Sequence, residues 1–418
     1  MSTTTTTTTT TSLFSSAPYI PPDAIFALTA QYNVDPSPVK VNLGQGTYRD
    51  DNGQPWVLPS VREARKAILE NGLYHEYLPI LGLKGLRDGV AKLIFGGGYD
   101  ALAQKLATSQ AVSGTGSLHL AGALIKSVTP KHLLEKRKVY IPAPTWSNHH
   151  LLFSSLGFDV VPFTYYNAHT KSLDIDSYLS ALRSAEPASV FILHACAHNP
   201  TGLDPTVEQW KEIGAIVKDR GLFPVFDAAY LGFNSGDYDA DAWAIRYFAA
   251  ELGIECAVCA SFAKNMGLYG ERVGAVIIVT ADGTTARNTQ SVLESLQRSE
   301  ISNPPAFGAR IAETVLGDER LKGLWFEDLR TMSGRIAEMR RALVEGLGRY
   351  APEHDWGHLV RQSGMFGFLG LSKEVVLALR DEYHIYMADN SRISIAGLNT
   401  GNVEYVARSI GEVLAREQ

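Results

Sequence analysis

Two polar side chains that each follow an apolar run could act together chemically. Asp227 follows the run 223–226, and Lys264 closes the run 257–262. If both runs are buried parallel strands, their carboxyl ends open onto the crevice where α/β folds bind ligands. Asp227 on its own could equally be a helix cap. A lysine at the same rim could lose its water, and an amine whose pKa is lowered in this way can form a Schiff base.

An acid beside such a lysine indicates which cofactor would use the pair. A carboxylate that keeps a heterocyclic nitrogen protonated turns the ring into an electron sink, which is the chemistry of pyridoxal phosphate. The loop Ser113-Gly-Thr-Gly116 lies between a strand candidate and a helical pattern, where backbone N–H groups and the helix dipole can hold a phosphate. Ser261 and Arg272 could add a hydroxyl and a bidentate guanidinium. Each of these features alone could be a turn or a surface pair.

Other cofactors have weaker signatures in this sequence. No Gly-Lys pair occurs, which removes the phosphate loop of nucleotide hydrolases, and His119 stands where a dinucleotide fingerprint needs glycine. The spacings His194-Ala-Cys196-Ala-His198 and Cys256-Ala-Val-Cys259 suit metal ligands, but neither has a matching second half. Small buried cysteines in strands explain both patterns as well. We therefore expect no metal site.

The elements that must position these residues alternate between short β-rich runs and helical patterns. The strand candidates are 111–112, 138–141, 159–163, 189–194, 223–226, 255–261 and 273–279, and the helical patterns between them include 117–127, 149–156, 175–185 and 206–220. This alternation is typical of an α/β domain with buried, mostly parallel strands. Upstream, we expect helices at 24–31, 60–71, 86–94 and 101–107.

The two ends of the chain have a different texture. Residues 1–16 are rich in Thr and Ser, which predicts a disordered lead-in, and 17–50 reads as an arm that joins a smaller domain. We predict a large domain over 51–325 and a small α+β domain over 326–418. In the latter region we expect strands at 367–371 and 393–395 and a closing helix at 402–417, after long helices at 306–316 and 321–350.

Composition narrows the class of protein. The formal net charge is -6, so no basic field favours nucleic acid or an anionic membrane surface. No apolar run approaches the roughly 20 residues that span a bilayer. Three cysteines in 418 residues fit a reducing compartment, and Lys40 is the first basic residue, which disfavours an organelle leader. The composition predicts a cytoplasmic protein that acts on small molecules.

Four motifs occur together in an order that resembles a known family. They are His198-Asn-Pro-Thr-Gly202, Asp227-Ala-Ala-Tyr230, Ser261-Phe-Ala-Lys264 and Ser302-Asn-Pro-Pro305. In these motifs the chain resembles the aspartate aminotransferases, which are class I aminotransferases of the fold-type I pyridoxal phosphate superfamily, from about residue 23 to the C-terminus. The resemblance implies a mostly parallel seven-stranded sheet in a large domain, a smaller α+β domain, and pyridoxal 5'-phosphate as cofactor.

The resemblance also implies a role for each cofactor-site residue. Lys264 carries the Schiff base and moves the proton, Asp227 pairs with the pyridinium nitrogen, and Tyr230 hydrogen-bonds the phenolic oxygen. The further cofactor contacts that it implies are Asn199 at the phenolic oxygen, Trp146 stacked on the ring, His149 behind Asp227, Ser113, Gly114, Thr115, Ser261 and Arg272 at the phosphate, and Tyr77 from a partner subunit. The active site is then shared across a homodimer.

Substrate choice would depend on two arginines, since a dicarboxylate needs two planar cations. The resemblance makes Arg392 the clamp for the α-carboxylate and Arg298, from the neighbouring subunit, the clamp for the side-chain carboxylate. Gly46 would let the backbone approach the substrate and Phe366 would wall the pocket, alongside Trp146 and Asn199. The sequence departs from the family at Gln45, Leu231 and Ile301, near the substrate.

These residues predict reversible amino transfer between L-aspartate and 2-oxoglutarate, which gives oxaloacetate and L-glutamate by a ping-pong mechanism. One alternative is a pyridoxal phosphate enzyme of the same fold that acts on an aromatic or sulfur-containing amino acid, or that catalyses decarboxylation or elimination. Another is a catalytically silent protein that kept the fold as a binding or interaction module.

Overall fold

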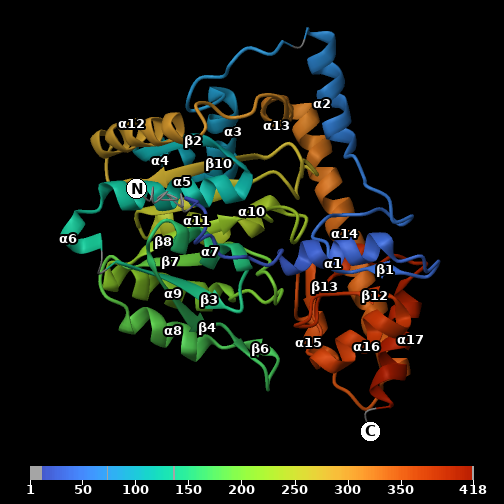
Figure 1. The fold of residues 1–418 in the computed structure, drawn as a ribbon. Coiled ribbons are helices and arrows are strands. Elements are labelled where there is room, and N and C mark those ends of the chain that lie inside the picture. The colour runs from blue at the N-terminus through green and yellow to red at the C-terminus, as the bar shows by residue number, and fades with distance from the viewer. Residues whose placement is uncertain (1–11, 73, 135–136, 417–418) are drawn as a thin grey trace, which may run out of the picture.

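A seven-stranded sheet forms the centre of the fold (Figure 1). The computed structural model describes residues 12–72, 74–134 and 137–416. The strand order is β2-β10-β9-β8-β7-β3-β4; β10 is antiparallel to both neighbours and the other pairs are parallel. The strands are β2 (Leu106–Val112), β3 (Lys138–Ala143), β4 (Asp159–Thr164), β7 (Val190–His194), β8 (Phe223–Ala228), β9 (Cys256–Ser261) and β10 (Val273–Val279). The predicted α/β fold with a mostly parallel sheet is confirmed.

The sheet is buried on both faces because its central strands are apolar along their whole length. In β7, Val190 and Ile192 pack in one core, whereas Phe191 and Leu193 pack in the core on the opposite face. The first face is covered by α5 (Ser113–Val128), α7 (Ser147–Ser155) and α12 (Gly283–Glu300), and the second by elements that include α3 (Lys84–Phe95), α8 (Ile175–Ser184), α9 (Val207–Arg220) and α13 (Phe307–Gly317). The strands are thus held rigidly, and so are the residues at their ends.

Segments from both ends of the chain come together beside this sheet. The parallel pair of β1 (Val41–Asn42) and β12 (Ile385–Tyr386) joins the N-terminal segment to the C-terminal one. A second small sheet pairs β11 (Phe366–Phe368) with β13 (Arg392–Ser394). Figure 1 shows the blue α1 lying against these red elements. The long helix α14 (Glu319–Tyr350) packs on α2 (Pro59–Glu70) and α13 as well as on α17 (Val403–Leu414), and so connects the two parts.

The remaining elements are short or peripheral. They are α1 (Ala24–Val34), α2 (Pro59–Glu70), α4 (Tyr99–Leu102), α6 (Lys131–Leu134), α10 (Tyr238–Asp241), α11 (Trp243–Arg246), α15 (Gly357–Val360), α16 (Lys373–Tyr383), α17 (Val403–Leu414), the strands β5 (Tyr166–Asn167) and β6 (Ser172–Leu173), and the single turns η1 (Gly96–Gly98), η2 (Ala103–Lys105), η3 (Tyr247–Glu251) and η4 (Ile395–Gly397). Across the described ranges, no helix is long and apolar enough to cross a membrane.

One helix prediction was wrong. We expected helix over 101–107, but α4 ends at Leu102, a single turn follows, and β2 begins at Leu106. Pairing with β10 decides this, because Leu106 lies opposite Val279 and every residue up to Val112 has a partner there. The same pairing extends the strand candidate 111–112 toward the N-terminus. Tertiary contacts override local propensity in such a segment.

Smaller differences lie in the C-terminal region and at the N-terminus. The strands expected at 367–371 and 393–395 run instead over β11 and β13, one residue earlier at their starts, and β1 and β12 were not predicted at all. The closing helix expected over 402–417 is α17, and Glu417 lies outside the described residues. Of the lead-in predicted over 1–16, residues 1–11 also lie outside them, and 12–16 form a turn.

Candidate active site

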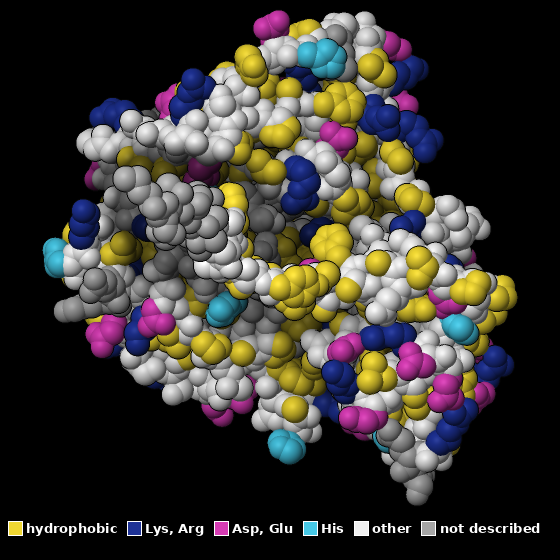
Figure 2. All heavy atoms as spheres, in the orientation of Figure 1, with side chains coloured by type: hydrophobic (Ala, Val, Ile, Leu, Met, Phe, Trp, Pro, Cys, Tyr) yellow, Lys and Arg dark blue, Asp and Glu magenta, His cyan; other side chains and the backbone are white. Residues whose placement is uncertain are grey.

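A cavity of about 1140 Å³ lies at the carboxyl ends of β8 and β9. Figure 2 shows the molecular surface hollowed beside α1, with apolar side chains on the rim. The predicted site residues that line this cavity are Gly46, Ser113, Gly114, Thr115, Trp146, Asn199, Asp227, Tyr230, Ser261, Lys264, Arg272, Phe366 and Arg392. Residues far apart in the sequence therefore meet at the strand ends, as the crevice rule for α/β sheets requires.

Lys264 reaches the cavity from the turn that follows β9. Its Nζ lies 5.4 Å from the centre of the Tyr230 ring. Burial lowers the pKa of the amine, and nearby Arg272 lowers it further, while the charge of Asp227 acts in the opposite direction. The net effect is a lowered pKa, which increases the share of neutral amine that can attack a carbonyl.

Asp227 begins a chain of buried polar groups. Its Oδ2 lies 2.9 Å from His149 Nε2, and His149 Nδ1 lies 2.9 Å from Thr145 Oγ1, which is 3.0 Å from His194 Nε2. His149 has no exposed surface. Burial raises the pKa of Asp227, but the hydrogen bond from His149 and its charge outweigh this, so the net pKa is lowered. The arrangement keeps a buried carboxylate ionised.

Thr145 and His194 extend this chain beyond the residues that we predicted for the site. His194 is directly opposite Asp227 in the parallel pairing of β7 and β8, so strand register places them together. Thr145 lies four residues before His149, just ahead of α7. The sequence held a signal for His194, because its position closes a buried strand, but the histidine was weighed there only as a metal ligand.

The first turn of α5 forms an anion-binding cradle. Ser113 adopts a left-handed backbone with φ 59°, and its hydroxyl lies 2.9 Å from that of Ser261. Among the residues that the structure describes, no side chain caps the start of α5, which leaves its first N–H groups available to a ligand. A Cβ at Gly114 would contact Ser261 at 3.4 Å, which leaves little spare room between the helix and β9. Arg272 lines the same region and donates to Tyr269 O at 3.0 Å.

Arg392 also lines the cavity. The residue is 8% exposed, and its guanidinium sits 4.4 Å from the centre of the Phe366 ring and donates to Gly44 O. Nε of this side chain has no hydrogen-bond partner in the described part of the chain. Burial lowers the pKa of Arg392. A buried cation with a spare donor is costly by itself, which makes it suited to a carboxylate ligand.

Three predicted site residues, Tyr77, Arg298 and His149, do not line this cavity. Tyr77 is 87% exposed and lines a separate hollow of about 360 Å³ together with Ile301. Arg298 is exposed at the end of α12 and donates to Ser302 Oγ at 2.5 Å. His149 contacts Asp227 from behind. Conversely, the start of α1 at Asp23 to Phe26 lines the cavity although we had not assigned it to the site.

The fold and this cavity define the class of protein. The chain matches the family described as aminotransferase class I and II over residues 38–410. It therefore belongs to the class I and II aminotransferases, and the predicted enzyme class is confirmed.

Individual relatives indicate which aminotransferases within this class the chain is similar to in sequence and length. The chain is 44% identical over 411 residues to the cytoplasmic aspartate aminotransferase of Saccharomyces cerevisiae, with 96% of this chain and 97% of the relative covered. It is also 44% identical over 394 residues to the mitochondrial aspartate aminotransferase of Dictyostelium discoideum, with 94% and 91% covered.

Solved structures agree with these relatives. The yeast cytoplasmic aspartate aminotransferase superposes with a TM-score of 0.93 at 43% identity, covering 97% of this chain and 99% of that one. An aromatic-amino-acid aminotransferase from Burkholderia pseudomallei, covalently bound to pyridoxal phosphate, gives a TM-score of 0.93 at 40% identity, covering 97% and 100%. Neighbours with different substrates therefore share this fold.

Proposed function

We propose that this aminotransferase moves the amino group between L-aspartate and 2-oxoglutarate, forming oxaloacetate and L-glutamate by a ping-pong mechanism. The observation that carries the proposal is one cavity that joins a lysine with a lowered pKa, an ionised buried carboxylate and a buried arginine, namely Lys264, Asp227 and Arg392. The aspartate aminotransferases at 44% identity over most of the chain support the same reaction.

The cavity fits pyridoxal 5'-phosphate as cofactor. The uncapped start of α5, Ser261 and Arg272 would hold its phosphate, Asp227 its ring nitrogen and Trp146 its ring face. When bound, the cofactor supplies the carbonyl that condenses with an amine and a ring that takes up electrons from the substrate's α carbon. The residues of the chain must then orient the substrate and move protons.

Each residue has a role that its surroundings support. Lys264 Nζ takes the proton from the α carbon and returns it, which its lowered pKa favours. Asp227, kept ionised by His149, holds a proton on the ring nitrogen. Arg392, which lines the cavity, would bind the α-carboxylate and fix the orientation of the α C–H bond. Tyr230 and Asn199, which line the cavity, would donate hydrogen bonds to the phenolic oxygen.

We also propose a homodimer with shared active sites. Tyr77 and Arg298 are exposed outside their own cavity, so they are free to serve the cavity of a second copy. The arm before α1 carries exposed apolar side chains, since Leu13, Phe14, Tyr19 and Ile20 are all at least 76% exposed in the described part of the chain. In this arrangement Arg298 would bind the side-chain carboxylate of the substrate.

Domain limits and location are further parts of the proposal. The seven-stranded sheet falls within 51–325, and β11 to β13 fall within 326–418, which supports the predicted division. The relatives include both cytoplasmic and mitochondrial proteins. A cytoplasmic location stays a prediction.

A second candidate is an aminotransferase for aromatic amino acids. The Burkholderia neighbour favours it. The departures Gln45, Leu231 and Ile301 do not line the cavity, so they favour neither candidate. Steady-state kcat/KM for aspartate, glutamate, phenylalanine and tyrosine separates the two candidates. We expect aspartate to be preferred at least tenfold over phenylalanine. A preference for the aromatic donors would replace the first candidate with the second.

The lysine itself is tested by Lys264→Ala. The cofactor-loaded wild type should absorb near the edge of the visible range, and the variant should lose both this band and transamination because no amine remains to bind the carbonyl. An unchanged spectrum and rate would contradict the proposed chemistry.

A further inference from the structure

One buried amide joins the segment of Lys264 to the loop of Tyr230. Asn265 is 2% exposed, and its Nδ2 donates to the carbonyl oxygen of Leu231 at 3.1 Å. Leu231 directly follows Tyr230, and Asn265 directly follows Lys264. This hydrogen bond therefore spans the two segments one residue away from the groups that face the cavity.

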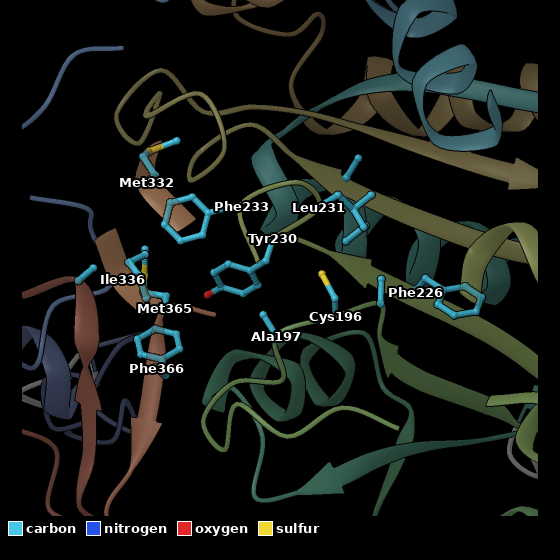
Figure 3. Packing of buried hydrophobic residues seen from close by; sticks show 14 of the residues in the cluster. Cys196, Ala197, Phe226, Tyr230, Leu231, Phe233, Met332, Ile336, Met365 and Phe366 are labelled. Atoms are coloured by element: carbon cyan, nitrogen blue, oxygen red, sulfur yellow. The ribbon is translucent and has the colours of Figure 1, made fainter. Parts of the chain in front are cut away.

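The loop after Tyr230 is otherwise held from its far side. The Asp241 carboxylate accepts from Gly232 N at 2.8 Å, Ser235 N at 3.2 Å and Asn234 Nδ2 at 3.2 Å. Figure 3 shows Tyr230 and Leu231 pointing to different sides of the chain, with Phe233 and Phe366 beside the Tyr230 ring. Asn265 supplies the contact on the side of the lysine.

The position of Asn265 is itself fixed by α14. The indole Nε1 of Trp325 donates to the carbonyl oxygen of Asn265 at 2.7 Å, and Trp325 has no exposed surface. Because this hydrogen bond holds the Asn265 backbone, a shift of the Tyr230 loop would stretch or break the contact between Asn265 and Leu231. A side-chain hydrogen bond between two rigid segments fixes their separation.

We propose that Asn265 is a positioning residue that sets the Tyr230 hydroxyl relative to Lys264, and so tunes the proton affinity of the cofactor bound to that lysine. The inference rests on the proposed function, because it requires Tyr230 to donate to the phenolic oxygen. A donor there stabilises negative charge on the oxygen and makes the nearby protonated nitrogen more acidic. A displaced hydroxyl weakens this effect, so the nitrogen holds its proton to higher pH.

The test is a pH titration of the visible absorbance of the cofactor-loaded protein without substrate. Tyr230→Phe should raise the midpoint by about one to two pH units, because it removes a hydrogen bond to a charged oxygen. Asn265→Ala should raise it by about half as much. In the double variant, Asn265→Ala should add nothing to the shift of Tyr230→Phe, because its effect passes through the missing hydroxyl.

A matched control separates positioning from loss of stability. Gln110 is a fully buried amide that also bridges segments, through Leu83 N at 3.1 Å and Pro305 O at 2.8 Å. Gln110→Ala should lower the thermal midpoint comparably and leave the pH midpoint unchanged. If Asn265→Ala behaves as this control does, or shifts the pH midpoint equally with and without the Tyr230 hydroxyl, the inference is wrong.

Failure of the proposed function gives a different result. If Tyr230→Phe alone leaves the midpoint unchanged, its assigned contact is wrong and the inference falls with it. Should Asn265→Ala not fold, Trp325→Phe provides the same comparison, since it removes the indole N–H that holds the Asn265 backbone. An upward shift that disappears without the Tyr230 hydroxyl supports the inference, and no shift in a folded Trp325→Phe variant refutes it.

Discussion

Replacement of His149 by leucine tests how the buried carboxylate is kept ionised. The imidazole donates a 2.9 Å hydrogen bond to Asp227, which is only 8% exposed. In His149→Leu the burial that raises the Asp227 pKa is no longer opposed by its main partner. The pKa of Asp227 then rises, so a smaller share of the carboxylate is ionised. A neutral Asp227 would stabilise the proton on the cofactor's ring nitrogen less.

The magnitude follows from the contact that is lost. A hydrogen bond to a charged group contributes about 1.5–3 kcal/mol, and each 1.36 kcal/mol changes a rate tenfold. If the loss is felt in the step at the α carbon, kcat for aspartate should fall roughly 10- to 150-fold. KM should change less, because His149 does not line the cavity and Arg392 is untouched.

The pH dependence of kcat should show in which direction the Asp227 pKa moves. In the folded wild type this pKa is lowered, so the carboxylate stays ionised at pH values where an ordinary aspartate would take up a proton. In His149→Leu this pKa rises, and the acid limb of the kcat profile should move to higher pH. Thr145→Val is the matched control, since it removes the hydroxyl behind His149 but leaves the bond to Asp227. A His149→Leu variant with wild-type kcat and an unmoved acid limb would refute the reasoning.

Two further predictions concern substrate choice and stability. Arg298→Ala should reduce kcat/KM for aspartate at least tenfold more than for phenylalanine, because only the dicarboxylate loses an ion pair; equal losses would contradict its role as the second clamp. Asp35→Asn should lower the thermal midpoint at pH 7, because the Asp35 carboxylate accepts from Ser37 N at 2.8 Å and from Tyr386 at 2.7 Å and pairs with His384. The Asp35 pKa is lowered from 3.8 to about 2, so this stability is fully present above pH 3.8 and lost as pH falls through about 2. A difference between variant and wild type that persists at pH 2 would contradict this assignment.

The sequence could predict the centre of the fold because its strands are continuous apolar runs. Residues 273–279 read as a strand, and β10 has those limits. The beginning of β2 could not be read, because Leu106 to Gln110 become strand only through their pairing with β10. β1 and β12 are two residues each and exist only because they meet. Such elements carry no periodic signal in a single segment.

The roles of cavity residues were predictable where a chemically distinctive side chain follows an apolar run, as for Asp227 and Lys264. Contacts that arise only between segments were not. Thr145 joins His149 to His194 through hydrogen bonds that depend on strand register. Asn265, next to Lys264, donates to the carbonyl oxygen of Leu231, next to Tyr230, and this contact depends on loop packing. Neither residue type is distinctive by itself. The supporting residues of an active site therefore have to be read from the structure.

The start of α1 connects the cavity to the exposed apolar arm that precedes this helix. Asp23 caps the helix by accepting from Ile25 N at 2.9 Å, and the first turn lines the cavity on the side of Arg392. Phe26 in that turn is 78% exposed, and the arm before it is apolar. If a second copy covers this arm, it also fixes the entrance to the cavity and brings its Arg298 to the substrate. Dimer assembly would then decide substrate choice, and a monomeric variant should lose discrimination between aspartate and phenylalanine before it loses the ability to bind the cofactor.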